Sequence, residues 1–286
     1  MKVLILGTGK TGTTVMVYKV AGGLPNCHAF SGGRPGKYIG DYENAVYKHT
    51  YEERKGKSFE LFRDHLKNEH YDRKIWMARD PRDAAVSRML YRWHGGIKGH
   101  KKQYEAHLNL VLKKEKDPPS LPFHEICRYT GHDGSPRTVE AVIEEERNRY
   151  QQMLEFVAGL GSDWKLFTFE DMVAKKFSDL NEYLGFEVQA DATVPSASGK
   201  AKVIRKKATG DWRHWFTEED TAIFKPAFIP YMELIGYDCD DWKPASNPLI
   251  EAKFSSEYMQ SLPRKAKKNK VLRYLDPVVQ KWARKG

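Results

Sequence analysis

Short apolar runs alternate with amphipathic stretches along the chain. Residues 3–6 (VLIL) form a continuous apolar run that ends at Gly7, which is typical of a parallel strand buried on both faces. Residues 13–21 then carry apolar side chains at helical spacing. The pattern predicts three strand–helix pairs: 3–6 with 13–21, 75–78 with 81–93, and 165–169 with 176–184. Strands that alternate with helices predict an α/β fold with a central parallel sheet flanked by helices.

Residues 138–161 predict a longer amphipathic helix that ends at glycines. By contrast, residues 94–102 (HGGIKGHKK) and 113–125 (KKEKDPPSLPFHE) combine glycine, proline and charge, a composition typical of mobile loops. A chain of 286 residues can form one large domain or two small ones. We expect one α/β domain over residues 1–245, followed by a basic C-terminal extension over 246–286.

The formal net charge of +10 lies mostly at the C-terminal end. Residues 253–286 contain ten Lys or Arg and two Asp or Glu, a surplus of +8, which leaves +2 for the rest of the chain. A charge run of this kind is usually a solvated face. Binding of nucleic acid or of a membrane surface through it is therefore the less favoured interpretation.

The three cysteines are far apart and odd in number, so the sequence predicts neither a disulfide framework nor a zinc site. No apolar run approaches the roughly 18 residues of a membrane span. The first predicted strand begins at Lys2 or Val3, which leaves no room for a signal peptide. We expect a soluble cytoplasmic protein without a membrane span.

The loop after the first predicted strand, GTGKTGTT, satisfies more than one phosphate-binding pattern. Gly7, Gly9 and Gly12 fit the dinucleotide fingerprint G-x-G-x-x-G. That fingerprint needs an acidic residue about 20 residues later, where this chain reads GLPNCHAF. It also has no role for Lys10 or for the threonines that follow. The dinucleotide interpretation is therefore incomplete.

The triplet GKT also suggests a nucleoside-triphosphatase loop, but that motif would need glycine where Leu4 stands. The strand that should end in a Mg²⁺-binding acid ends in Arg79 instead. These motifs share an anion site at a helix N-terminus, and in this loop backbone N–H groups, a lysine and hydroxyl groups can form it. The loop is predicted to bind a phosphate-like anion.

A second group of cations and hydroxyls is predicted to bind another anion. Arg79 follows a predicted strand and Ser87 lies eight residues later on the next predicted helix. A guanidinium offers the planar, permanently charged fork that suits phosphate. The segment RKKATGDWRHWFT, residues 205–217, adds three cations before a Gly-Asp-Trp turn. An ion pair of Arg79 with Asp83 and a surface charge run are the structural alternatives.

Four blocks in order, GTGKTGTT, RDPRDAAVS, FEDM and RKKATGDWRHWFT, resemble the signature blocks of sulfotransferases that use 3′-phosphoadenosine 5′-phosphosulfate (PAPS). The blocks span residues 3–217, and LIGYD near residue 238 resembles the usual close of the domain. The resemblance implies a P-loop-like sulfotransferase domain. It also implies that PAPS is the co-substrate, that adenosine 3′,5′-bisphosphate is the product, and that no metal is required.

The resemblance implies roles for particular residues. The 5′-phosphosulfate would be held by Lys10, Thr11, Gly12, Thr13 and Thr14, and the 3′-phosphate by Arg79, Ser87, Arg205 and Lys206. Phe169 would lie near the adenine, where the family often has tyrosine. Lys207 stands where the family commonly has glycine, and either adds a phosphate contact or turns outward.

Sulfuryl transfer needs a group that neutralises the leaving oxygen and a base that takes the acceptor proton. We assign the first role to Lys10, while Lys48 is expected to contact the sulfuryl oxygens. His49 is the first choice for the base because an imidazole titrates near neutral pH, and Glu43 or Asp41 is the alternative. The candidate catalytic residues are Lys10, Lys48, His49 and Ser87.

The sequence thus predicts transfer of a sulfuryl group to a hydroxyl or amine of a carbohydrate or small-molecule acceptor, with loops at about 93–136 shaping the acceptor pocket. The alternatives are a P-loop kinase or NTPase, a dinucleotide oxidoreductase, and a nucleic-acid binder that uses the basic extension. Acceptor identity and oligomeric state do not follow from the sequence.

Overall fold

The computed structural model describes residues 1–32, 42–51, 66, 69–97, 99–130, 136–196, 204–206 and 208–263. The strands are β1 (Lys2–Thr8), β2 (His28–Phe30), β3 (Ala45–Tyr51), β4 (Arg73–Ala78) and β5 (Trp164–Thr168). The labelled α-helices are α1 (Thr13–Gly22), α3 (Pro81–Tyr91), α4 (Lys101–Lys116), α5 (Phe123–Cys127), α6 (Val139–Ala158), α7 (Phe169–Val173), α8 (Ser178–Leu184), α9 (Trp212–Trp215) and α10 (Glu218–Ile235), and residues 256–263 are helical as well. Short 3-10 helices span Arg92–Gly95, Pro118–Ser120, Arg128–Thr130 and Ala252–Phe254.

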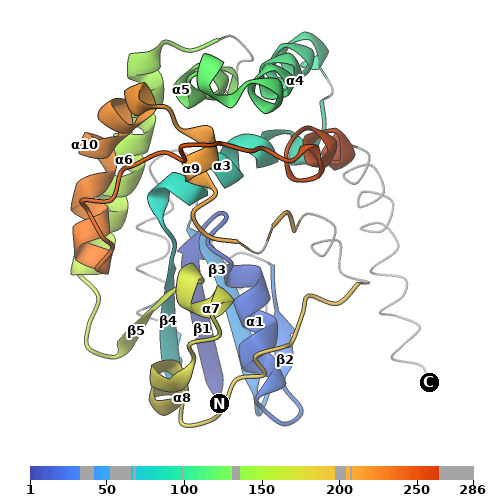
Figure 1. Cartoon of the computed structure of the whole chain (residues 1–286). Helices are drawn as coiled ribbons and strands as arrows, with labels where there is room; N and C mark the ends of the chain where they lie inside the picture. The colour runs from blue at the N-terminus through green and yellow to red at the C-terminus, as the bar shows by residue number, and fades with distance from the viewer. Residues whose placement is uncertain are drawn as a thin grey trace. The chain divides into compact units, whose positions relative to one another are not determined.

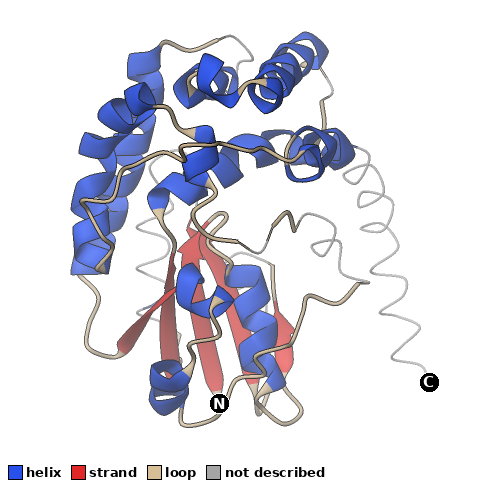
Figure 2. Cartoon of the chain, viewed as in Figure 1, coloured by secondary structure: helices blue, strands red, loops and turns tan. Residues whose placement is uncertain are grey.

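The five strands in the described part of the chain form one parallel sheet in the order β2-β3-β1-β4-β5 (Figures 1 and 2). In its centre, Leu6 of β1 lies between His49 of β3 and Trp76 of β4. Parallel strands need crossover connections, usually helices, and α1 forms such a connection between β1 and β2, which lie on either side of β3 in the sheet. The predicted α/β fold with a central parallel sheet flanked by helices is confirmed.

The predicted strands at 3–6, 75–78 and 165–169 are confirmed as β1, β4 and β5, and the predicted helices as α1, α3, α8 and α6. One end differs. Phe169 begins helix α7 instead of ending a strand, because the Thr168 Oγ1 accepts a hydrogen bond from the Asp171 N–H (3.0 Å) and so caps a helix there. Helix α8 ends, as expected, at Gly185, which is in the left-handed conformation (φ 80°).

The predicted loops at 94–102 and 113–125 are wrong in part, because Lys101–Lys116 forms helix α4 and Phe123–Cys127 forms α5. Four of the five lysines on α4 are exposed, while His107 and Val111 are buried. Lys114 is buried as well, and its ammonium donates to the carbonyls of Pro118 and Leu121 at 2.6 Å each. Burial lowers the pKa of Lys114 to about 8. A buried lysine is therefore tolerated in α4, because two carbonyls accept hydrogen bonds from its ammonium.

The described residues divide into two compact units. The sheet unit comprises Met1–Ala84, Glu145–Pro195 and Pro226–Asp241. The helical unit comprises the described residues of Ala85–Glu144, Ser196–Lys225 and Trp242–Gly286.

The sheet unit has helices on both faces of its sheet. On one face, side chains of β1 and β4 such as Val3 and Ile75 pack with Met16 and Val20 of α1 and with residues of α7 and α8. On the other face, the Trp76 ring lies 5.3 Å from the ring of Phe156 on α6. Both faces of the central strands are thus covered, which explains why these strands are continuous apolar runs.

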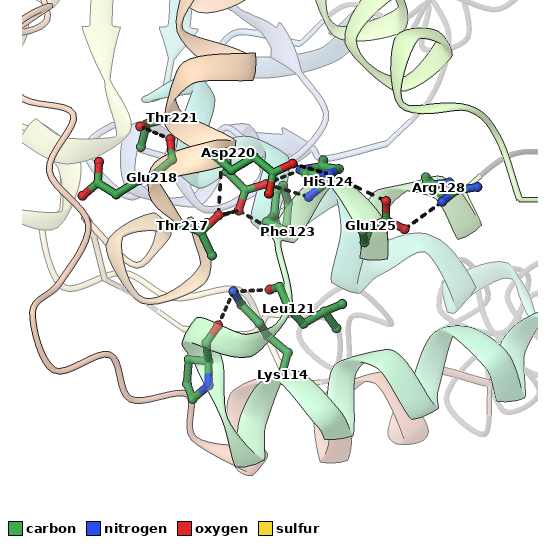
Figure 3. A network of polar contacts seen from close by, with 12 residues as sticks. Lys114, Leu121, Phe123, His124, Glu125, Arg128, Thr217, Glu218, Asp220 and Thr221 are labelled. Atoms are coloured by element: carbon green, nitrogen blue, oxygen red, sulfur yellow. Dashed lines mark hydrogen bonds and ion pairs between the residues drawn. The ribbon is translucent and has the colours of Figure 1, made fainter.

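The helical unit has a buried carboxylate at its centre, shown in Figure 3. Asp220 on α10 is fully buried and accepts hydrogen bonds from the Phe123 N–H (2.7 Å), the His124 N–H (2.9 Å) and His124 Nδ1 (2.8 Å) on α5. It also accepts from the N–H (2.8 Å) and the hydroxyl (2.9 Å) of Thr217. One side chain therefore satisfies the first two N–H groups of α5 and the N–H of Thr217, the residue before α10.

Candidate functional site

The loop between β1 and α1 is a tight turn that admits little side-chain volume. A Cβ on Gly7 would lie 2.7 Å from the Met77 carbonyl oxygen, closer than real contacts allow. The Thr11 hydroxyl donates to the Thr8 carbonyl across the turn (2.8 Å), and both threonines are buried. The loop therefore has one compact conformation, pressed against the end of β4.

The turn leads directly into the N-terminus of α1. Lys10 (φ 76°) and Gly12 (φ 84°) are both left-handed, and the Gly12 carbonyl accepts from the Val15 and Met16 N–H groups to start the helix. The helix cap makes no side-chain hydrogen bond, and the first turn of α1 contains no acidic residue. Uncapped N–H groups and the positive end of the helix dipole attract anions.

Lys48 of β3 brings a second ammonium to this helix N-terminus. Its Nζ donates to the Thr14 hydroxyl at 2.9 Å, so it reaches the first turn of α1 from the neighbouring strand. Lys10 lies within the turn itself. Two lysines from separate segments thus belong to one small region, which favours a strongly anionic ligand.

Arg79 reaches the same loop from the end of β4. Its Nη1 donates to the Lys10 carbonyl at 2.9 Å, and its guanidinium carbon lies 4.2 Å from the centre of the Phe169 ring. Arg79 and Phe169 are both buried. The structure therefore brings together the predicted residues Lys10, Thr14, Lys48, Arg79 and Phe169.

Gly12→Ala is expected to lower the free energy of unfolding by at least about 2 kcal/mol, because an L residue at φ 84° is strained and its Cβ would lie 2.7 Å from the Phe169 ring. Two matched variants separate these causes in urea unfolding. Gly99→Ala has a similar φ of 81° in open space, and we expect about 1–2 kcal/mol. Gly95→Ala, which has open space and no left-handed φ, should change stability by less than about 0.5 kcal/mol. Equal effects at positions 12 and 99 would show that Phe169 does not crowd the loop.

None of the predicted general bases that the structure describes is placed at the N-terminus of α1. His49 is buried and follows Lys48 on β3, and since successive side chains of a strand point to opposite faces, it lies on the face away from Thr14. Glu43 lies at the N-terminal ends of the strands, where its carbonyl accepts from the amino group of Met1, whereas the loop follows the C-terminal end of β1. Asp41 lies outside the described residues.

The other predicted phosphate ligands belong to the helical unit. Ser87 is buried on α3. The Arg205 guanidinium donates to Asp211 (2.8 Å) and to the Phe254 carbonyl (3.3 Å), and the Lys206 ammonium lies 3.4 Å from the same Asp211. Burial raises the pKa of the Asp211 carboxyl, but the two cations outweigh burial and lower it overall. Lys207 lies outside the described residues.

Glu170 was not identified from the sequence, although it directly follows Phe169. Its two carboxylate oxygens accept from the Asp80 N–H (3.2 Å) and from the Tyr237 hydroxyl (2.5 Å). Burial raises the pKa of Glu170 above its ordinary value. The signal for it was an acid placed at the C-terminal end of a predicted buried strand. It ties the start of α7 to the segment that carries Arg79.

No protein-family model matches the chain, and no curated protein matches it in sequence. Among solved structures, it is similar to the crystal structure of a mouse sulfotransferase, SULT7A1, complexed with PAP, with a TM-score of 0.43 and 15% sequence identity over 81% of this chain and 84% of that chain. A likeness at so low an identity and TM-score carries no argument about activity, so we infer function from the residues of this chain.

The described residues contain neither a membrane-spanning helix nor a metal-binding group. None of the helices there combines the length and the apolar character needed to cross a membrane. Within the same residues, no group of three or more His, Cys, Asp or Glu side chains is arranged to hold a metal ion.

Proposed function

We propose that the chain is a sulfotransferase that moves the sulfuryl group of PAPS to a hydroxyl or an amine of a carbohydrate or small-molecule acceptor. The observation that carries the proposal is the cationic cradle of the sheet unit. It consists of the uncapped N-terminus of α1, Lys48 on the Thr14 hydroxyl, and Arg79 on the carbonyl of Lys10. Donors and cations from three segments suit a ligand with more than one anionic group.

We assign the two ends of such a nucleotide to different residues of the chain. In the reaction, the acceptor oxygen or nitrogen forms a bond to sulfur, the bond from sulfur to the 5′-phosphate oxygen breaks, and adenosine 3′,5′-bisphosphate leaves. We assign the 5′-phosphosulfate to the loop Lys10–Thr14, with Lys10 neutralising the charge on the leaving oxygen and Lys48 contacting the sulfuryl oxygens. Phe169 offers an apolar ring for the adenine.

The 3′-phosphate ligands stay predictions in each unit by itself: Arg79 in the sheet unit, and Ser87, Arg205 and Lys206 in the helical unit. Asp211 holds the guanidinium of Arg205 and the ammonium of Lys206 on one carboxylate. Fixed cations bind phosphate with less loss of side-chain entropy than mobile ones. His49 stays a prediction as the general base, and the segment around residues 93–136 stays a prediction for the acceptor pocket.

The end of β4 favours this proposal over a P-loop NTPase. An NTPase of that class has a carboxylate at the end of the neighbouring strand to hold Mg²⁺ beside the loop. Here the first side chain after β4 is the guanidinium of Arg79, and it donates directly to the loop. A permanent cation at that place favours an extra anionic group on the ligand.

Calorimetric titration of the full chain with adenosine 3′,5′-bisphosphate, ADP, ATP with Mg²⁺, NAD and a short DNA tests the proposal. We expect the bisphosphate to bind at least about 10-fold more tightly than ADP, since an additional charged hydrogen-bonded phosphate contributes about 1.5–3 kcal/mol. Equal affinity for ADP, or tighter binding of NAD or DNA, would contradict it. Transfer of sulfate from PAPS to a panel of sugars, phenols and amines then identifies the acceptor class.

A further inference from the structure

Lys10 holds a backbone conformation that L residues seldom adopt. Its φ of 76° is left-handed, a region in which the Cβ of an L residue crowds the following carbonyl. Strain of this kind persists only where the surroundings hold the residue in place. A nearby group must therefore stabilise the Lys10 peptide in its observed orientation.

Arg79 is the side chain that binds this peptide. Its Nη1 donates to the Lys10 carbonyl at 2.9 Å, although the two residues are 69 positions apart in the sequence. A hydrogen bond from a charged donor is stronger than a neutral one, and only 5% of Arg79 is exposed to solvent, so water competes little for it. The bond acts on the strained residue itself.

Arg79 is in turn held by Phe169. The guanidinium lies 4.2 Å from the centre of the Phe169 ring, within the range of a cation–π contact. The same ring lies under Gly12, where a Cβ would meet it at 2.7 Å. The start of α7 that carries the ring is tied to the end of β4 by the hydrogen bond from the Asp80 N–H to Glu170 (3.2 Å). Two segments of the sheet unit, the end of β4 and the start of α7, thus meet at the loop.

We propose that Arg79 is a positioning residue for the anion loop, and that its guanidinium, stacked on Phe169, keeps Lys10 left-handed and the first N–H groups of α1 aimed at the ligand. This role differs from a contact to the 3′-phosphate, because it acts on the 5′ end of the nucleotide. It rests on the proposed function in so far as this loop is the one proposed to hold the 5′-phosphosulfate.

The chain offers a matched control on the same strand. Arg73, at the opposite end of β4, donates from Nε to the Tyr183 carbonyl (2.7 Å), and its guanidinium carbon lies 5.6 Å from the centre of the Tyr183 ring. Arg73→Ala removes the same kind of carbonyl bond and ring contact without touching the loop. Both variants therefore lose a carbonyl hydrogen bond and a ring contact, but only Arg79→Ala loses them at the loop.

Amide hydrogen exchange of the ligand-free full chain tests the positioning role without any assumption about the ligand. We expect exchange in residues 7–14 to be about 10-fold faster in Arg79→Ala than in wild type, and unchanged there in Arg73→Ala. If residues 7–14 exchange at the wild-type rate in Arg79→Ala, the proposal is overturned. Should Arg79→Ala fail to fold, Arg79→Lys keeps a cation without the planar fork, and the loop exchange of that variant decides in the same way.

Titration with ADP, which has no 3′-phosphate, measures binding at the 5′ end alone. General destabilisation would affect ADP affinity in Arg79→Ala and Arg73→Ala alike. We expect Arg79→Ala to weaken ADP binding about 10-fold and Arg73→Ala to leave it unchanged. An Arg79→Ala variant that loses affinity for adenosine 3′,5′-bisphosphate but not for ADP would overturn the positioning role and leave only the phosphate contact. If the wild type binds neither nucleotide, the proposed function fails, while the exchange experiment still decides the role of Arg79.

Discussion

Lys10→Ala is expected to lower the rate of sulfuryl transfer from PAPS about 10²- to 10³-fold, the usual cost of removing one group aimed at charge that develops in the transition state. Lys10 belongs to the turn that opens α1, next to the N–H groups proposed to hold the phosphate in ground state and transition state alike. Because the role proposed for Lys10 is to neutralise the leaving oxygen, kcat should fall more than the affinity for adenosine 3′,5′-bisphosphate. Single-turnover rates and calorimetric titration measure the two effects separately.

Lys10→Gly is the matched control for this experiment. Alanine at position 10 loses the ammonium and keeps a Cβ at φ 76°, whereas glycine loses the ammonium and relieves the backbone strain. Both variants should lose the rate to a similar extent if charge neutralisation is the cause. A glycine variant that transfers sulfate at the wild-type rate would show that Lys10 contributes through the backbone and not through its charge.

Asp220→Ala is expected to lower the free energy of unfolding by about 3–5 kcal/mol, the cost of removing one partner from a buried charged pair. Asp220 is fully buried and accepts five hydrogen bonds, from Phe123, His124 and Thr217. Alanine would leave these donors without an acceptor and without water at the first turns of α5 and α10. Urea unfolding measures the loss, and amide exchange in α5 assigns it to the helical unit.

Asp191→Ala provides the contrast, because Asp191 forms an ion pair with Lys175 (2.7 Å) in which 83% of the Asp191 side chain is exposed. Its loss should change stability far less than the loss of Asp220, because water screens an exposed ion pair. Asp220→Asn keeps the shape and one acceptor, and should lie between the two alanine variants. Equal losses in Asp220→Ala and Asp191→Ala would contradict a central role for the buried carboxylate.

The pair of His124 and Asp220 should also make stability depend on pH. Burial alone would lower the pKa of His124, but the bond to Asp220 and the nearby Glu219 and Glu125 raise it overall. Burial alone would raise the pKa of Asp220, but its hydrogen bonds lower it overall. The stability from His124 is therefore lost as pH rises through its raised pKa, and that from Asp220 is lost as pH falls through its lowered pKa. Both slopes should be weaker in Asp220→Ala when unfolding is followed across pH.

The central strands were predictable because their signal is local. Residues 3–6 and 75–78 are apolar on both faces, and that composition follows from burial between two layers of helices. The strand Ala45–Tyr51 was not predicted, because AVYKHTY carries a lysine and a histidine. Lys48 finds a partner in Thr14 of α1, and that partner lies in another segment of the chain.

Helix α4 is a second element that the sequence did not predict. Glycine, proline and charge at 94–102 and 113–125 predicted loops, yet Lys101–Lys116 is helical. The buried ammonium of Lys114 is tolerated because the carbonyls of Pro118 and Leu121 satisfy it. Composition counts the charge, but it does not show which acceptors the folded chain will place around that charge.

For the candidate site, the sequence by itself determined the chemistry available at each strand end: the glycines of the turn, Lys10, and an arginine where an NTPase would have an acid. Only the tertiary structure decided what these groups do to one another, since the order β3-β1-β4 places Lys48 and Arg79 on either side of one loop. The physical reason is the distance along the sequence over which each interaction acts. Apolar runs and turn glycines act over a few neighbouring residues, whereas the bond from Arg79 to the Lys10 carbonyl joins groups that meet only after the sheet has formed.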